Sequence, residues 1–111
     1  MALLSNQQIA ITGLNPSLVA AAGGGDSFAN EGQNKQFLWV DNAGGSSINV
    51  TIDDILSVAP TGATSFNADV VVAVTNAQRR LIGPFPSSRF GDTVSWTYSA
   101  VTSVTVGVFK V

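Results

Sequence analysis

A period of two governs much of the chain after residue 36, and no other feature of the sequence constrains the fold as strongly. Apolar and polar residues alternate over segments 47–53, 94–99 and 103–108. Alternation of this kind places one face of a strand in a core and the other toward solvent or a partner. Most of the alternating residues are β-branched or aromatic, the types that suit a pleated sheet. The three segments are therefore predicted to be strands.

Two continuous apolar runs predict further strands. Residues 37–40 read Phe-Leu-Trp-Val, and residues 68–75 contain four valines. We expect 68–75 to be a strand that is buried on both faces or paired centrally, because consecutive β-branched residues disfavour a helix. Pro84 and Pro86 are expected to end a strand after Ile82 or to confine it to a sheet edge.

The first third of the chain has a different character. Residues 7–12 predict one strand. Residues 15–22 begin with Asn-Pro and are followed by glycine, which predicts a short capped helix of about two turns. Residues 23–34 are polar and glycine-rich, and we expect them to form one long loop.

These patterns predict an all-β protein, an antiparallel and jelly-roll-like β-sandwich with an extended N-terminal arm and one short helix. The length of 111 residues suits one domain. We expect residues 1–36 to form the N-terminal arm and the glycine-rich loop, and residues 37–111 to form the β-sandwich domain.

The amino-acid composition argues against several classes of function. Only 11% of the residues are charged, against about 25% in an average soluble domain. So few charged residues leave uncharged surface that other subunits can cover, which favours a protein that works as a component of an assembly. The five basic residues are too few and too scattered for nucleic-acid binding. No apolar stretch is long enough to span a membrane, and the first eight residues lack the features of a signal peptide, so we expect a soluble product made in the cytoplasm.

The chain has no histidine and no cysteine, which removes the most common catalytic and metal-binding side chains. A disulfide framework is excluded as well. We therefore predict that the protein is not an enzyme, and that it has no catalytic residue, no metal site and no cofactor.

The spacing of the carboxylates does not indicate a catalytic or metal-binding motif. Asp53 and Asp54 follow a predicted strand and are interpreted as a solvated turn, with a calcium pair as the alternative. Asp26 and Glu31 flank a glycine-rich stretch, but nothing in the spacing fixes a ligand geometry. Cation binding near Asp26 or Asp53 is left open.

The aromatic and basic residues have structural interpretations. Trp96 and Tyr98 share a predicted strand face with Val94, which favours a core or a subunit contact over a platform for sugars or bases. The Arg79-Arg80 pair is typical of a charge that guards a sheet edge, with a salt bridge to a neighbouring subunit as the alternative.

Several segments resemble one known family. They are 37–45 (Phe-Leu-Trp-Val-Asp-Asn-Ala-Gly-Gly), 80–86 (Arg-Leu-Ile-Gly-Pro-Phe-Pro), Phe90-Gly91-Asp92, 94–98 (Val-Ser-Trp-Thr-Tyr) and the valine-rich final strand. Together they resemble the small head decoration, or cement, proteins of tailed phages, over roughly residues 37–111. The residues before Phe37 carry no part of the likeness.

The resemblance implies a β-sandwich that trimerises at local threefold positions on the outside of a phage capsid and stabilises the shell. The implied partners are the major capsid protein and two further copies of the chain. We expect the contact surface to include apolar residues of the arm and several later residues: Leu3, Leu4, Ile9, Ile11, Leu14, Arg79, Arg80, Phe85 and Arg89. The alternatives are another virion β-module (a head–tail adaptor or fibre domain), a carbohydrate-binding module, and a small-molecule-binding barrel or enzyme.

Overall fold

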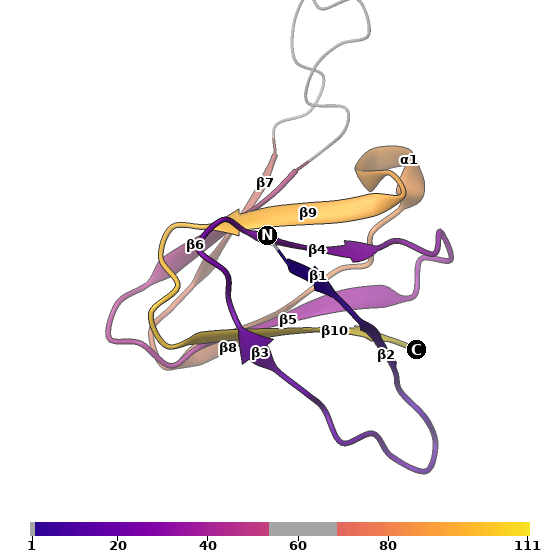
Figure 1. Ribbon diagram of the computed structural model, residues 1–111, viewed down its shortest axis with the longest axis horizontal. Coiled ribbons are helices and arrows are strands. Elements are labelled where there is room, and N and C mark those ends of the chain that lie inside the picture. The colour runs from indigo at the N-terminus through magenta and orange to yellow at the C-terminus, as the bar shows by residue number, and fades with distance from the viewer. Residues whose placement is uncertain (1, 54–68) are drawn as a thin grey trace, which may run out of the picture.

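The computed structural model describes residues 2–53 and 69–111, which form two facing β-sheets (Figure 1). Sheet A contains, in spatial order, β1 (Ala2–Leu4), β4 (Asp26–Ala29), β9 (Thr93–Tyr98), β6 (Ile48–Ile52) and β7 (Val70–Val74). Sheet B contains β2 (Asn6–Gln8), β10 (Val104–Lys110), β5 (Gln36–Asn42) and β8 (Gln78–Ile82), and β3 (Val19–Ala20) also pairs with β10. The predicted all-β sandwich is therefore confirmed.

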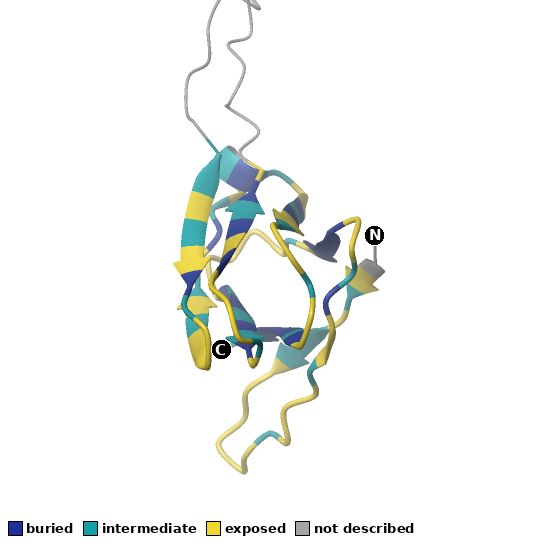
Figure 2. Cartoon of the chain, turned by 90° about the vertical axis from the view of Figure 1, so that its left-hand side faces the viewer, coloured by how far each residue is buried: buried dark blue, intermediate teal, exposed yellow. Residues whose placement is uncertain are grey.

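The core lies between the two sheets, and the alternating residues fill it as the period of two predicts. Every second residue of β6 is buried, and the inward residues of β5, β9 and β10 are buried in the same way (Figure 2). The largest fully buried side chains are Trp96, Phe28, Leu38 and Ile52. Phe28 packs against Trp96 and Phe85, with ring centroids 5.8 and 5.5 Å apart. Burial of this apolar surface is the main favourable term in folding.

The N-terminal residues are part of both sheets. Strand β1 pairs with β4 in sheet A, and after Ser5 the chain crosses to sheet B, where β2 pairs with β10. Both of these pairings are parallel, whereas the other pairings among the described residues are antiparallel. The expected arm is thus extended, and it forms one edge strand in each sheet.

Three predictions for this region are wrong in whole or in part. Residues 15–22 do not form a helix: Val19–Ala20 is strand β3, and the Ala21 N–H donates to the Val104 carbonyl at 3.0 Å. A two-turn helix is marginal, whereas pairing with β10 satisfies the backbone directly. The expected long loop at 23–34 is interrupted by β4, whose Phe28 belongs to the core. The strand expected at 7–12 ends at Gln8, and a turn follows, in which the Gly13 N–H bonds to the Ala10 carbonyl.

The helix that the structure contains is α1 (Ser87–Phe90), a single turn that follows Pro86. No helix within 2–53 and 69–111 has the length and apolarity needed to cross a membrane.

The valine-rich strand is also placed differently from its prediction. Strand β7 is neither central nor buried on both faces, because it is the last strand of sheet A, and Val71 and Ala73 point outward and are exposed. Ala68, where this strand was expected to start, lies outside the described residues. The prediction for β8 is confirmed: it ends at Ile82 and lies at the edge of sheet B.

Candidate partner interface

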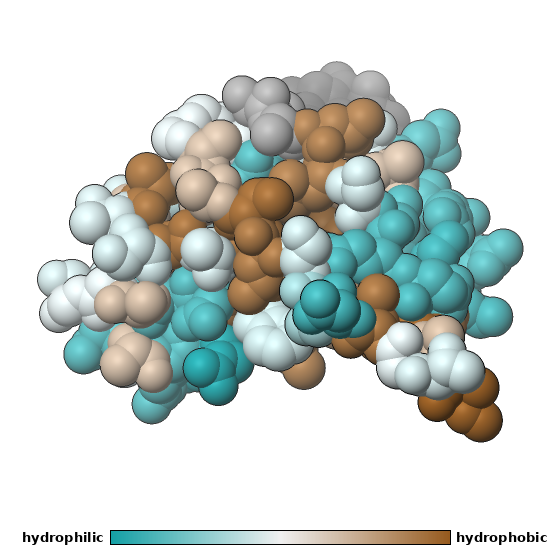
Figure 3. Space-filling view, turned by 60° about the horizontal axis from the view of Figure 1, so that its bottom comes forward, coloured by the Kyte–Doolittle hydropathy of each residue, from teal (hydrophilic) through white to brown (hydrophobic). Residues whose placement is uncertain are grey.

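The loop between β2 and β3, residues 9–18, projects beyond sheet B (Figure 1). It carries three of the predicted contact residues, Ile9, Ile11 and Leu14. Ile11 is fully exposed at 104% of its reference area, and Ile9 is 40% exposed. Figure 3 shows hydrophobic surface at the projecting tip of the molecule and in a band across the adjoining face. Large aliphatic side chains at a projecting tip are typical of a surface that another molecule covers.

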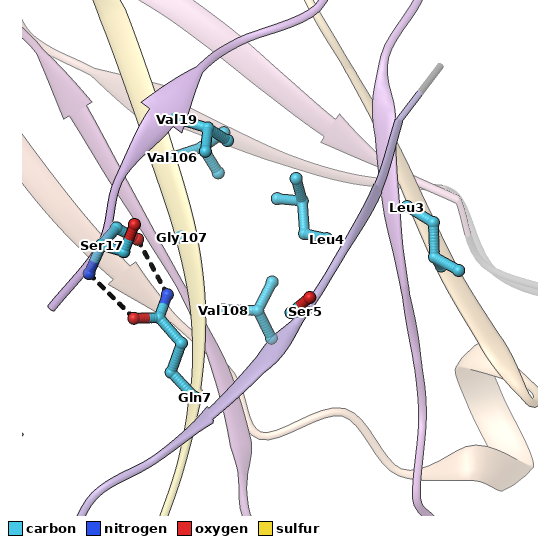
Figure 4. Close-up of a pocket in the computed structure, with 9 residues that line it drawn as sticks. All are labelled: Leu3, Leu4, Ser5, Gln7, Ser17, Val19, Val106, Gly107 and Val108. Carbon is cyan, nitrogen blue, oxygen red and sulfur yellow. Dashed lines mark hydrogen bonds between the residues drawn. The ribbon is translucent and has the colours of Figure 1, made fainter.

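The Gln7 side chain fixes the base of this loop. Its Nε2 donates to the Ser17 carbonyl at 2.8 Å, and the Ser17 N–H donates to Gln7 Oε1, also at 2.8 Å (Figure 4). The amide therefore closes the loop in the way that a pair of backbone hydrogen bonds would. A loop held in this manner loses less conformational entropy when a partner binds.

The absence of a side chain at Gly107 brings the same loop close to sheet B. A Cβ at this position would lie 2.8 Å from Leu18 Cδ2 and 3.1 Å from the Ser17 carbonyl oxygen. Leu18 therefore packs over β10 at Gly107, where any side chain in place of the glycine would collide with it.

A groove of about 290 Å³ separates the loop from the outer face of sheet B. One wall comes from the loop, through Ile9, Leu14 and Pro16. The other comes from outward residues of three strands: Phe37, Trp39, Leu81 and Phe109. The strand register brings these together, since Phe37 pairs with Phe109 and Trp39 pairs with Leu81. The Phe109 ring centroid lies 5.7 Å from that of Phe37 and 5.8 Å from that of Trp39. We call this groove and residues 9–16 the loop–groove surface.

Trp39, which lines the groove, carries a buried polar atom. Its Nε1 is buried and has no hydrogen-bond acceptor within the described part of the chain. A buried donor without an acceptor costs about 1–3 kcal/mol. The apolar lining of the groove around it suits a hydrophobic partner.

Leu3 and Leu4 lie beside a second hollow, of about 300 Å³, between the N-terminal strands and β10 (Figure 4). Leu3 is 70% exposed, whereas Leu4 packs against the core. The structure thus leaves only Leu3 of this pair largely exposed.

The remaining predicted contact residues lie apart from the loop–groove surface, except that the two arginines share β8 with Leu81. Arg79 Nε is 3.8 Å from Asp41 Oδ2, and Arg80 Nη1 donates to the Arg79 carbonyl at 2.9 Å. Arg89 lies over the Phe90 ring, 5.3 Å from its centroid. Phe85 is only 2% exposed and packs in the core, so in this fold its side chain offers no surface to a partner. The Phe85 ring packs edge-on against the rings of Phe28 and Phe90, with centroids 5.5 and 5.2 Å away.

A buried polar chain connects the aromatic residues of β9 to Asp26. Trp96 Nε1 donates to the Tyr98 hydroxyl at 2.7 Å, and that hydroxyl donates to Asp26 Oδ2 at 2.7 Å. Burial raises the pKa of Tyr98 well above its ordinary value of 10, and the bond to Asp26 raises it further. These hydrogen bonds join β4 to β9, and the raised pKa keeps the Tyr98 hydroxyl protonated as a donor to Asp26.

Asp26 Oδ1 is buried and has no hydrogen-bond partner within residues 2–53 and 69–111. The same residues contain no group of three or more acidic, His or Cys side chains that could hold a metal ion. Asp53 is largely exposed, and its partial desolvation together with the charge of Asp69 raises its pKa. Asp54, the other member of the proposed calcium pair, lies outside the described residues.

Sequence reasoning missed the apolar wall of the groove. None of its four residues was among the expected contact residues: Phe37, Trp39, Leu81 and Phe109. The signal was present in the run 37–40, because a strand that is apolar at every position has an apolar outer face as well as an apolar inner one.

Comparisons with protein-family models, with curated proteins and with solved structures gave no match to this chain.

Proposed function

We propose that this chain is a non-enzymatic structural protein that attaches to a larger protein assembly through its loop–groove surface. In finer terms, we propose a head decoration protein that binds the major capsid protein on the outside of a phage shell and is assembled as a homotrimer. Its place would be the virion surface, after synthesis in the host cytoplasm.

The exposed apolar loop carries this proposal. Ile11 projects completely into solvent, although burying an isoleucine side chain contributes about 1.5–3 kcal/mol. The Gln7–Ser17 bonds hold the loop in place, and the apolar groove lies directly beside it. In the isolated chain this arrangement leaves hydrophobic area exposed to water, which is unfavourable. A partner that covers this area removes it from water and gains that free energy.

The groove is better suited to a protein than to a sugar. Its lining residues carry no carboxylate, carboxamide or guanidinium side chain that could bind hydroxyl groups: Ile9, Ala10, Gly13, Leu14, Pro16, Phe37, Trp39, Leu81 and Phe109. Apolar and aromatic anchors in a pocket are typical of protein–protein contacts. The carbohydrate-binding alternative is therefore disfavoured.

Co-sedimentation with empty phage heads tests the proposal, using heads of the phage that, on this proposal, encodes the chain. Ile11→Asp and Thr102→Asp place the same charge at two exposed positions, the first in the loop–groove surface and the second in the turn between β9 and β10, outside that surface. We expect Ile11→Asp to weaken binding at least about 10-fold, which corresponds to about 1.4 kcal/mol, because it loses the buried side chain and adds a desolvated charge. Thr102→Asp should stay within about twofold of the unmodified chain, because solvent and salt screen a charge that lies outside the contact.

Two results would contradict the proposal. One is an unmodified protein that does not sediment with heads at any concentration tested. The other is equal binding by both aspartate variants, which would exclude an apolar contact through this loop.

A further inference from the structure

Strand β7, at one edge of sheet A, has an unusual composition. Strand β7 reads Val-Val-Val-Ala-Val, and within the described residues it pairs only with β6. It carries no charge, no proline and no glycine, and Val71 is 59% exposed. Exposed edge strands normally carry such features, because their unpaired backbone groups otherwise recruit another strand.

The edge of sheet B shows the contrast. Strand β8 also lies at an edge, but Arg79 and Arg80 occupy its second and third positions. If β8 paired with itself about its central residue, the two copies of Arg80 would lie opposite each other, which is destabilising. Of these two edge strands, β8 carries charge and β7 carries none.

Antiparallel pairing of β7 with a second copy brings compatible residue types opposite one another. With a twofold axis at Val72, Val70 lies opposite Val74 of the second copy, and Val71 lies opposite Ala73. All cross-strand neighbours are then aliphatic, and pairs of β-branched residues stabilise a sheet. An isologous contact of this type closes on itself and does not propagate into fibres.

The charges at the two ends of β7 fit the same arrangement. Asp69 directly precedes the strand, and its charge acts on Asp53. Arg79 and Arg80 follow the tight turn at the opposite end, where the Gln78 N–H bonds to the Thr75 carbonyl at 3.1 Å. An antiparallel partner brings the acidic end of each copy toward the basic end of the other.

We infer that two copies of this chain pair through β7, antiparallel about a twofold axis at Val72, and join their sheets A into one continuous sheet. This contact goes beyond the proposed attachment to a shell, because β7 belongs to sheet A and contributes no residue to the loop–groove surface. A threefold contact would use other surfaces. Where the twofold axis crosses the threefold axis at right angles, the two contacts together give a hexamer, whereas the β7 contact alone gives a dimer.

Charge substitutions at the two outward positions test both the contact and its register. In Val71→Lys/Ala73→Lys, each lysine lies opposite a lysine of the other copy. In Val71→Lys/Ala73→Glu, each lysine lies opposite a glutamate. Both variants change the same two exposed positions, so they make similar demands on the fold of one chain.

The readout is native mass by sedimentation at low ionic strength. For a subunit of 11.4 kDa, twice that mass is about 23 kDa and six times is about 68 kDa, and we expect one of these for the unmodified chain. The double-lysine variant should have half the unmodified mass, and the lysine–glutamate variant should keep it. Half of 68 kDa would show that a trimer persists, so the outcome for β7 is separate from that for the threefold contact.

A mixing experiment guards against a variant that simply folds badly. Val71→Glu/Ala73→Glu should also have the halved mass when alone, and mixing it with the double-lysine variant should restore the unmodified mass. An odd number of copies in the unmodified protein, equal masses for the two lysine variants, or no association in the mixture would each overturn the inference.

Discussion

Replacing Tyr98 with phenylalanine removes the central member of the buried polar chain. Trp96 is fully buried, so its indole N–H loses its acceptor without access to water. Asp26 Oδ2 loses the hydroxyl and keeps only the Ala22 N–H, at 3.2 Å. Stranding a buried polar group costs about 1–3 kcal/mol, and two groups are affected here. We expect a loss of about 2–5 kcal/mol, a large fraction of the roughly 5–15 kcal/mol that stabilises a typical domain.

Urea unfolding followed by tryptophan fluorescence measures this loss, with Thr97→Val as the control. Thr97 is on the same strand but faces outward, and its replacement should change the free energy of unfolding by less than about 0.5 kcal/mol. If Tyr98→Phe behaved like the control, the hydroxyl would not hold the two buried groups.

The effect of Tyr98→Phe on stability is also expected to depend on pH in alkaline solution. Because the pKa of Tyr98 is raised in the fold, the unfolded chain loses this proton first as the pH rises above 10. Stability then falls by up to about 1.4 kcal/mol per pH unit. The difference in stability between the unmodified chain and Tyr98→Phe should therefore shrink above pH 10. A constant difference would contradict the assigned environment of the hydroxyl.

Three further predictions use the same unfolding assay. Gly25→Ala should cost about 2 kcal/mol or more, since its φ is +96° and a Cβ would clash with the Trp96 carbonyl, whereas Gly23→Ala meets no atom within 4 Å and should be nearly neutral. Asp53→Asn should stabilise the fold by about 0.5 kcal/mol or less at pH 7 and not at pH 3, because a raised carboxyl pKa lowers stability once the group ionises; equal effects at both pH values would contradict this. Gln7→Met should cost about 1–2 kcal/mol and speed hydrogen exchange at the Ser17 amide, and unchanged exchange would show that the clamp does not form.

The sequence predicted the parts of the fold that depend on local pattern. Ile48, Val50 and Ile52 face the core because a strand alternates its side chains, and Pro84 stops β8 because proline cannot continue the pairing. The helix predicted at 15–22 was wrong because its capping signals compete with pairing to β10, a contact about 85 residues away in the chain.

The candidate site could be predicted only in part, for the same reason. Ile9, Ile11 and Leu14 were expected at a contact surface because they are apolar residues in a segment outside the main strand pattern. Their partners across the groove come from β5, β8 and β10, and only the strand register reveals that Trp39 and Leu81 are neighbours. The bonds between Gln7 and Ser17 depend on a side-chain conformation that carries no sequence signature.

A hydrogen-exchange footprint of the protein bound to empty heads would show which face of the molecule touches the shell. We expect slower exchange in residues 9–16 and along the outward positions around Trp39, with the outer face of sheet A unchanged. Unchanged exchange in the loop, with slowing confined to the outer face of sheet A, would contradict attachment through the loop–groove surface.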